Sequence, residues 1–339
     1  MTHPFLIKDI AFQAGLSTAT VDRVLNGRPG VRRHTEMRVH AAIAELEKQQ
    51  AGAPSAGRRL TLDILMEAPE RFTTAVRDAF EAELATFLPT LFRCRFHFAE
   101  IMRPADLAQS IDRIRLRGTD GMVVKAPDVP EVAEAVARAT AAGIPVVTLV
   151  TDLANVGRAA YAGADNRAAG ETAAYLIGET LSGSRTGVLV TLSSSRFRGE
   201  EERETGFRRI IRERFPSIGI TEISEGHGTD AATGELVAAA LARDAAIDSV
   251  YSIGGGNRAV LAAFERAGRP IRLFVAHDLD VENRALLKER RISFVLHHDL
   301  RMDARSAFRA IMAHPSGRGA AAVLSAVEII TPYNMPAAP

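Results

Sequence analysis

A repeated alternation of strand-like and helix-like segments over residues 60–313 most constrains the fold of this chain. Short runs rich in Val, Ile and Leu alternate with longer stretches rich in Ala, Glu and Arg, an order typical of parallel sheets covered by helices. Nine strands are more than a sheet of ordinary size contains, so we predict an α/β fold with two Rossmann-like lobes. The strand candidates are residues 60–66, 93–98, 121–125, 145–150, 186–191, 218–223, 249–253, 271–276 and 292–297. The helical candidates are residues 75–87, 105–115, 131–142, 167–181, 201–214, 231–243, 258–267, 281–290 and 303–313.

A different pattern, two short helices joined by a tight turn, occupies residues 7–27. Apolar residues from Ile10 onward recur at helical spacing, and Gly15 stands where a helix end needs positive φ. Ser17 is a good N-cap for the second helix, because its hydroxyl can accept from a backbone N–H of the first turn. The pattern predicts a helix-turn-helix, whose second helix would expose small or polar side chains that could meet base edges.

A third helix is expected to complete this N-terminal unit. Thr35 is a plausible cap for a helix over residues 36–48, in which Val39, Ile43 and Leu46 share one face. We therefore predict a DNA-binding domain over residues 1–48, with a protein-interaction module as the alternative. Residues 49–59 are rich in small residues and read as a hinge linker.

Charge is distributed unevenly along the chain. Residues 1–48 hold seven Lys or Arg against five Asp or Glu, whereas the whole chain has a net charge of only +1. A locally basic module on a nearly neutral body suits docking on DNA phosphates without general binding to polyanions.

The N-terminal residues resemble a known family. Residues 7–46, from Ile-Lys-Asp-Ile-Ala through Thr-Val-Asp-Arg-Val-Leu-Asn-Gly to Ala-Glu-Leu, are similar to the DNA-binding headpiece of lactose-repressor-type (LacI family) transcription regulators. The resemblance implies a periplasmic sugar-binding-protein fold for the effector-binding domain, residues 60–339, with ligand between its lobes. We place the first lobe at about 60–160 and 293–330, and the second at about 161–292. Relatives usually carry a hinge helix with an apolar wedge in the linker, but this linker contains Pro54 and no leucine.

The resemblance also implies a transcription regulator, expected to be a repressor, that binds a palindromic operator. Because one head cannot reach two half-sites about 34 Å apart, we expect a homodimer. Arg23 would make a bidentate contact with guanine. Asp22 stands where relatives more often have serine, and it is expected to accept from a cytosine amine or to pair with Arg23. The predicted DNA-binding residues are Ser17, Thr18, Ala19, Thr20, Asp22, Arg23, Asn26, Arg28 and Thr35.

An effector site is expected at the carboxyl ends of the strands, where open α/β sheets bind their ligands. The predicted effector-binding residues are Glu67, Phe72, Asp128, Thr151, Asp152, Arg158, Arg203, Asn257, Asp278 and His298. By family position, Arg203, Asp278 and His298 match places that commonly contact a sugar, although His298 replaces a more usual glutamine. The implied effector is a monosaccharide, a polyol or a related metabolite. The alternative for each charged residue is a salt bridge or helix cap at a lobe edge, and for Phe72 a place in the core.

Signals for catalysis or a cofactor are weak. Residues 254–259 can be written G-x-G-x-x-A, as in dinucleotide sites, but glycines at a strand-to-helix turn are common for steric reasons. Residues 193–195 lack the glycines of a nucleophile elbow, and residues 297–299 lack zinc-ligand spacing on a helix. We expect no catalytic site, metal or cofactor. The competing interpretations are an exported solute-binding protein and a nucleotide-using enzyme on the same body.

The cellular location is expected to be the cytoplasm. No apolar run approaches the roughly 20 residues that span a bilayer, and the N-terminus shows no secretory signal. The one cysteine, Cys94, is expected to be a packed strand or loop residue in a reducing compartment.

Overall fold

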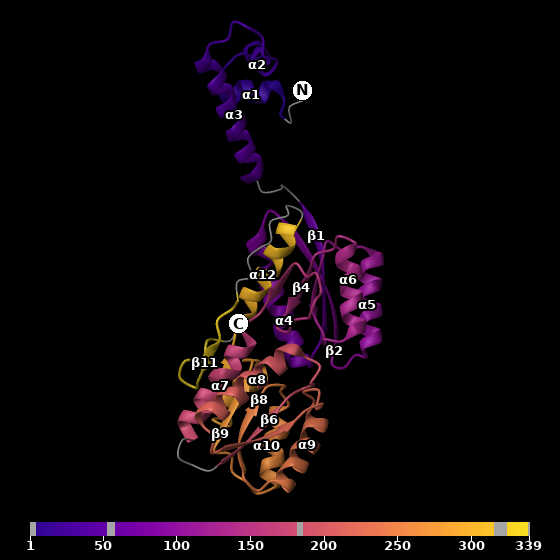
Figure 1. Cartoon of the computed structure of the whole chain (residues 1–339), viewed down its shortest axis with the longest axis vertical. Helices are drawn as coiled ribbons and strands as arrows, with labels where there is room; N and C mark the ends of the chain where they lie inside the picture. Colours follow the sequence, from indigo (N-terminus) through magenta and orange to yellow (C-terminus); the bar gives the residue numbers. More distant parts are fainter. Residues whose placement is uncertain (1–4, 53–57, 182–185, 315–323, 338–339) are drawn as a thin grey trace. The chain divides into compact units, whose positions relative to one another are not determined.

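The computed structural model describes residues 5–52, 58–181, 186–314 and 324–337 (Figure 1). The chain divides into two compact units, one of Met1–Arg58 with Pro89–Leu91 and one of Arg59–Leu88 with Phe92–Pro339. The first unit is a small helical domain, and the second holds two α/β lobes.

The helical unit consists of α1 (Ile7–Ala14), α2 (Thr18–Leu25) and α3 (Arg33–Gly52). Ile10, Val21 and Val39, one from each helix, are completely buried and form the centre of its core. Gly15 ends α1 in the left-handed region at φ 60°, and Arg38 of α3 donates to the carbonyl of Ala14 at 2.6 Å. The turn after α1 is therefore fastened to the third helix.

The third helix begins earlier than the sequence predicted. α3 starts at Arg33, and the carbonyl of Arg32 accepts from the backbone N–H groups of Thr35 and Glu36. Thr35 is thus the third residue of the helix and not its cap. The helix also runs on to Gly52, into the expected linker, while residues 53–57 of that linker lie outside the described residues.

The first lobe is built on a five-stranded sheet in the order β2-β1-β3-β4-β5. Its strands are β1 (Arg59–Glu67), β2 (Leu91–Ala99), β3 (Gly121–Lys125), β4 (Val146–Leu149) and β5 (Ala160–Ala162), and its helices are α4 (Glu70–Glu83), η1 (Leu84–Phe87), α5 (Pro104–Arg117), α6 (Pro130–Ala141) and α12 (Leu300–Ala313). Alternate side chains point to opposite faces of a strand. Val123 of β3 accordingly packs with α4 and α12, and Val124 packs with α5 and α6.

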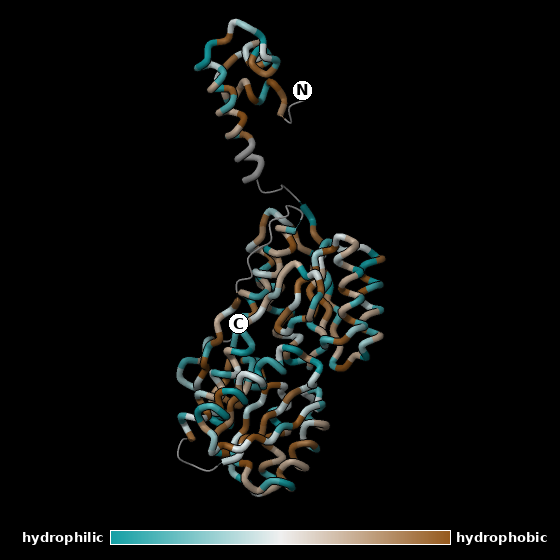
Figure 2. The backbone as a smooth tube through the Cα atoms, viewed as in Figure 1, coloured by the Kyte–Doolittle hydropathy of each residue, from teal (hydrophilic) through white to brown (hydrophobic). Residues whose placement is uncertain are grey.

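The second lobe is built on a six-stranded sheet in the order β11-β10-β9-β8-β6-β7. Its strands are β6 (Thr186–Thr191), β7 (Ile218–Ile223), β8 (Ile247–Ser252), β9 (Leu273–His277), β10 (Phe294–His297) and β11 (Glu328–Ile330), and its helices are α7 (Asn166–Leu181), α8 (Arg198–Arg214), α9 (Asp230–Arg243), α10 (Asn257–Arg266) and α11 (Val281–Lys288). Apolar residues of α7 and α8 pack on one face of this sheet, and those of α9, α10 and α11 pack on the other. Figure 2 shows the hydrophobic segments concentrated in the strands at the centre of the lobes.

The chain first crosses between the lobes near the predicted boundary, but it returns later than the sequence indicated. β5 still pairs with β4, so the chain leaves the first lobe after Ala162, close to the predicted boundary. The predicted return at Ser293 is too early, because β10 still pairs with β9 in the second sheet and the chain reaches the first lobe again at α12, which packs on α4. β11 then pairs antiparallel with β10, so residues 328–330 also belong to the second lobe.

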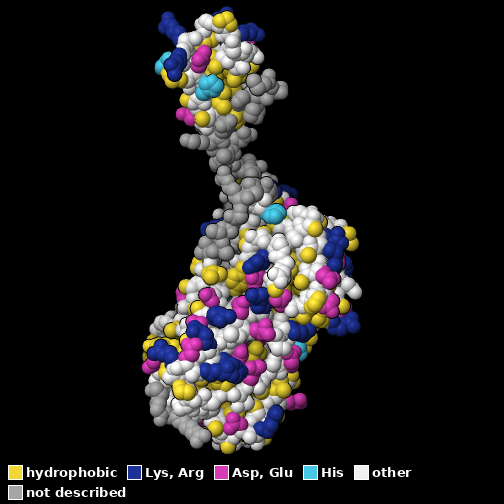
Figure 3. Space-filling model, in the orientation of Figure 1, with side chains coloured by type: hydrophobic (Ala, Val, Ile, Leu, Met, Phe, Trp, Pro, Cys, Tyr) yellow, Lys and Arg dark blue, Asp and Glu magenta, His cyan; other side chains and the backbone are white. Residues whose placement is uncertain are grey.

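The expectations about membrane spans and about Cys94 can be compared with the structure. Among the described residues, no helix combines the length and the apolar composition needed to cross a bilayer. Cys94 lies on β2 and packs, half-buried, against the α4 and α12 side of the first sheet. On the face of the lobes in Figure 3, positive and negative side chains lie next to one another.

Candidate functional site

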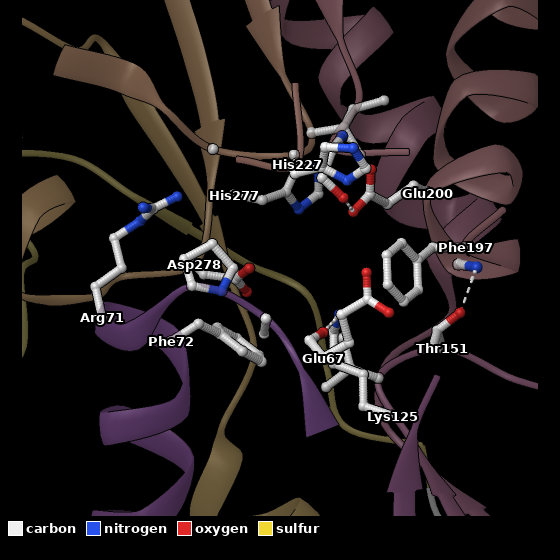
Figure 4. Close-up of a pocket in the computed structure, with 18 of the residues that line it drawn as sticks. Glu67, Arg71, Phe72, Lys125, Thr151, Phe197, Glu200, His227, His277 and Asp278 are labelled. Atoms are coloured by element: carbon white, nitrogen blue, oxygen red, sulfur yellow. Dashed lines mark hydrogen bonds between the residues drawn. The ribbon is translucent and has the colours of Figure 1, made fainter. Parts of the chain in front are cut away.

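A cavity lies between the two lobes, at the carboxyl ends of their strands. The space among its lining residues, together with the adjoining open solvent, amounts to about 780 Å³. Glu67 and Lys125 come from the ends of β1 and β3 in the first lobe, whereas Glu200 comes from α8 in the second (Figure 4). Arg203, also on α8, lines the cavity as well. The parallel strands of both sheets thus bring distant parts of the chain to one place.

Five of the ten predicted effector-binding residues line this cavity. They are Glu67, Phe72, Thr151, Arg203 and Asp278. Thr151 joins the lobes, because its hydroxyl accepts from the backbone N–H of Gly199 at 2.9 Å. Arg203 is only 4% exposed, and its Nε donates to the side-chain carbonyl of Asn166 at 2.8 Å. Asp278 follows β9 in the left-handed region at φ 65°, a conformation that aspartate and asparagine tolerate better than most residues.

Glu67 and Lys125 are polar residues of the cavity wall, next to the rings of Phe72 and Phe197. The Glu67 carboxylate points into the cavity near Phe197 (Figure 4), and its buried Oε2 accepts no hydrogen bond from any described residue. Burial raises the pKa of Glu67. The Lys125 ammonium donates to the Glu67 carbonyl at 3.1 Å and lies 4.1 Å from the ring centroid of Phe197. Burial lowers the pKa of Lys125.

The other five predicted residues do not line the cavity. Asp152 accepts from Thr148 and pairs at 2.5 Å with Arg158, so these two predicted residues bind one another at the lobe edge. Asp128 accepts from the backbone N–H of Ala154. Asn257 donates to Asn283 at 2.6 Å, and His298 lies behind Asp278, bonded to Asp303. For these residues the structure favours the alternative of a structural contact.

Several lining residues were not among the predicted ones. They are Arg71, Lys125, Phe197, Glu200, His227 and His277. Lys125 is the last residue of a predicted strand, so the strand-end rule applied one residue earlier would have found it. Glu200 accepts from the backbone N–H and the hydroxyl of Ser193 at 2.7 and 2.5 Å, and sequence spacing gives no sign of this contact.

Arg71 of α4 reaches from the first lobe to the second. Its two terminal nitrogens both donate to the carbonyl of Gly228 at 3.2 Å, and its Nε lies 3.2 Å from Oδ2 of Asp280. Gly228 belongs to a loop in which Glu225 and His227 also have positive φ. Burial raises the pKa of Asp280 to about 6. A cation from one lobe thus holds a bent loop of the other.

The glycines of residues 254–256 have a steric explanation. A Cβ on Gly254 would lie 1.9 Å from the backbone nitrogen of Ser193. Gly256 begins α10 with φ 73°, which a side chain would strain. These glycines allow the loop to pass close to its neighbours at the cavity wall, so the G-x-G-x-x-A spacing needs no nucleotide to account for it.

The outer side of α2 is exposed in the helical unit. Ser17, Thr18, Ala19 and Arg23 are exposed, and the Ser17 hydroxyl caps α2 by accepting from the N–H of Thr20 at 3.2 Å. This set presents small and polar groups around one arginine.

Asp22 does not pair with Arg23, which was one of the two expectations for it. Its carboxylate lies 3.4 Å from Nη1 of Arg28 and accepts from the Asn26 amide at 2.8 Å. Adjacent helical residues do not face one another, which explains why Asp22 does not pair with Arg23. Arg23 is left at the exposed side of α2.

Both parts of the chain match known families. Residues 64–319, more than half of the chain, match the family model of the periplasmic binding protein domain, and residues 6–47 match that of bacterial regulatory proteins, lacI family. The larger match defines the class, a two-lobed binding protein of the periplasmic type. The chain therefore belongs to the periplasmic binding protein domain family over residues 64–319, and its N-terminal helix-turn-helix matches bacterial regulatory proteins of the lacI family.

Individual relatives agree with this assignment. An uncharacterized HTH-type transcriptional regulator in the aml 5′ region of Streptomyces limosus is 31% identical over 170 residues, which cover 48% of this chain and 46% of that protein. The chain thus spans about half the length of this curated relative.

Solved structures share the two-lobed fold. A glucose-galactose binding protein, GanP, from Geobacillus stearothermophilus has a TM-score of 0.73 at 18% identity, covering 83% of this chain and 100% of that one. A putative LacI transcriptional regulator from Bacteroides fragilis has a TM-score of 0.70 at 15% identity, covering 82% and 98%. A carbohydrate transporter from Acidothermus cellulolyticus, in complex with myo-inositol, has a TM-score of 0.69 at 19% identity, covering 81% and 95%. At these identities the likeness establishes the fold alone.

Proposed function

We propose that this protein is a cytoplasmic transcription regulator, acting as a repressor, whose affinity for a palindromic operator is set by a small hydroxylated effector. The observation that carries the proposal is the presence in one chain of a helix-turn-helix with an exposed second helix and of a two-lobed cavity lined by polar and aromatic side chains. Two heads are needed to reach half-sites about 34 Å apart, so the proposal includes a homodimer.

The exposed side of α2 supports the DNA-binding part. Thr18, Ala19 and Arg23 are exposed on α2 and would face base edges in the major groove. The Ser17 cap stabilises the N-terminal turn of α2, which carries Thr18 and Ala19. Arg28 is 60% exposed and lies in the following loop, where it would contact phosphates. Its pairing with Asp22 reduces the repulsion that an acid near phosphates would cause.

The character of the cavity supports the effector part. Oε2 of Glu67 is an acceptor without a partner among the described residues, and Lys125 and Arg203 offer N–H donors. Phe72 and Phe197 supply apolar faces against which the C–H side of a sugar or a cyclic polyol can pack. The effector class that fits is a monosaccharide or polyol, and no metal, cofactor or catalytic step is part of the proposal.

DNA recognition is tested with duplexes from the region upstream of the protein's own gene. Fluorescence anisotropy at fixed salt should show tighter binding to one upstream duplex than to a shuffled one. Arg23→Ala should reduce this preference by about tenfold or more, since a bidentate contact to guanine discriminates by about 1–3 kcal/mol. Arg28→Ala is the matched control, and it should weaken both duplexes alike. An unchanged preference in Arg23→Ala would rule out α2 as the reading helix.

Effector binding is tested by thermal unfolding with D-glucose, D-galactose, myo-inositol and a panel of other neutral sugars. A ligand at about 100 times its Kd should stabilise the protein by about 2.7 kcal/mol. Asp278→Asn keeps a residue that tolerates positive φ and should abolish the response. Asp128→Asn, outside the cavity, should retain it. If NAD, NADP or ATP stabilises the protein and no sugar does, the nucleotide-using enzyme becomes the better interpretation.

A further inference from the structure

One buried histidine lies where the chain passes from one lobe to the other. β10 ends at His297 in the second sheet, and α12 begins at Leu300 and packs on α4 of the first lobe. His298 stands between them and is only 3% exposed. Its ring lies between a carboxylate of each lobe.

Both nitrogens of this ring face an acid. Nδ1 of His298 lies 2.7 Å from Oδ2 of Asp303, on α12. Nε2 lies 3.6 Å from Oδ1 of Asp278, the cavity residue that follows β9. Nε2 is buried and has no hydrogen-bond partner among the described residues, and the same is true of Oδ1 of Asp303.

A neutral ring cannot satisfy this arrangement. A neutral imidazole carries one N–H and one lone pair, so either tautomer would direct a lone pair at one of the two carboxylates. If Nδ1 carries the proton, Nε2 repels Asp278; if Nε2 carries it, Nδ1 repels Asp303 across 2.7 Å. The imidazolium has N–H groups on both sides and suits both acids.

The charged and titratable groups around the ring, taken together, also favour the imidazolium form of His298. Burial is the largest influence on the pKa of His298 and lowers it, and Arg203 of α8 acts in the same direction. The hydrogen bond and charge of Asp303, with the charge of Asp278, outweigh them and raise the pKa above its ordinary value. Burial lowers the pKa of the two neighbouring histidines, His277 and His297, which favours their neutral forms.

We propose that His298 is a positioning residue that, as an imidazolium, joins Asp278 of the cavity wall to Asp303 of the first lobe. The ion pair fixes the carboxylate of Asp278 and ties it to the segment through which the lobes are connected. The bridge itself stands on the geometry of the three side chains. Only its consequence, that an effector held by Asp278 binds more weakly when His298 loses its proton, rests on the proposed function.

The bridge is tested by NMR on the full chain with ¹³C-labelled histidine Cε1, in the absence of DNA and of any sugar. The His298 signal, identified by its loss in His298→Gln, should show the charged form at pH 6. Asp303→Asn should lower the midpoint of its titration by about one pH unit or more, and Asp278→Asn should lower it by less. His314→Gln, at the exposed end of α12, is the control and should leave the midpoint unchanged.

A second measurement covers the case in which a variant folds poorly. Because the pKa of His298 is raised in the folded protein, its contribution to stability is complete below the unfolded value of about 6.5 and is lost as pH rises through the folded value. The wild type should therefore melt higher than His298→Gln at pH 6, by a margin that shrinks toward pH 9. A His298 signal of the neutral form at pH 6, or a margin that does not change with pH, would overturn the proposal. Neither result depends on DNA or sugar binding, so failure of the bridge is distinguishable from failure of the proposed function.

Discussion

The two lobes share one architecture, but different interactions stabilise the interior of each. The first lobe holds two buried carboxylates that are bound by arginines. Asp63 is completely buried and pairs with Arg95 and Arg117, and Glu83 of α4 is 1% exposed and pairs with Arg301 and Arg305 of α12. In the second lobe, the helices α7 and α8 approach so closely that a Cβ on Gly170 would lie 1.8 Å from the carbonyl oxygen of Arg203.

Buried ion pairs and close helix packing stabilise the same fold in two different ways. A buried ion pair makes stability depend on the protonation of one acid. A close backbone contact makes it depend on volume, because neighbouring main chain cannot move aside cheaply. The first lobe should therefore respond to pH, and the second should respond to added methyl groups.

The largest effect is expected from Gly170→Ala. The added Cβ would meet main-chain atoms of α8, so the helices must separate, and we expect a loss of about 3 kcal/mol in the free energy of unfolding. Chemical denaturation measures the loss. Gly219→Ala, where the nearest atom is 3.8 Å away, is the matched control and should change stability by less than about 0.5 kcal/mol. Equal effects of the two substitutions would remove close packing as the distinguishing feature of the second lobe.

An intermediate effect is expected from Asp63→Asn. Burial raises the pKa of Asp63, but hydrogen bonds from His97 and Arg95 outweigh it and lower the pKa from 3.8 to about 2. A lowered pKa stabilises the fold above the unfolded value, and the contribution is lost as pH falls from about 4 toward 2.

At pH 7, Asp63→Asn should therefore cost about 2 kcal/mol, and urea denaturation should show the difference narrowing at acid pH. The control is Asp106→Asn, which breaks an exposed pair with Arg103 and should leave the denaturation midpoint unchanged. A cost for Asp63→Asn that is independent of pH would show that the charge is not what stabilises this lobe.

The smallest effect concerns the contact between the lobes. Arg71→Ala removes both hydrogen bonds to Gly228 and the pairing with Asp280, so the loop of residues 224–229 should open more often. Hydrogen exchange of the His227 amide should become about tenfold faster. Arg77→Ala, on the same helix but stacked on Phe96 within the first lobe, should leave this exchange rate alone. Unaltered exchange in Arg71→Ala would mean that other contacts hold the loop.

Local signals predicted the helical unit well. Gly15 ends α1 with positive φ and Ser17 caps α2, both as the sequence indicated, because these roles depend only on the residue and its nearest neighbours. The start of α3 was predicted wrongly. Its first turn is polar throughout, so an apolar pattern beginning at Val39 could not locate the first helical residue.

Features that depend on distant pairing were harder to predict. β5 and β11 were missed because three residues are too few to show a pattern. β10 was expected, but its pairing with β9 in the second sheet cannot be read from its own residues.

The residues of the candidate site were likewise predictable where their position depends on a single strand, and not where it depends on distant contacts. The strand-end rule found Glu67, Thr151 and Asp278, since parallel strands end at one edge. It also selected Asp152 and Arg158, because sequence alone does not reveal that they pair with one another. Arg71 and Phe197 lie at the cavity because of how the two lobes meet, which no local pattern encodes.

The position of Cys94 has a practical consequence for measuring motion in this molecule. Burial raises the pKa of its thiol to about 12, so very little of the reactive thiolate exists at neutral pH. Cys94 is the chain's single cysteine. Dyes or spin labels can therefore be attached to new cysteines on the surface of each lobe with the native sulfur left in place, and lobe separation can be followed without altering the core of the first sheet.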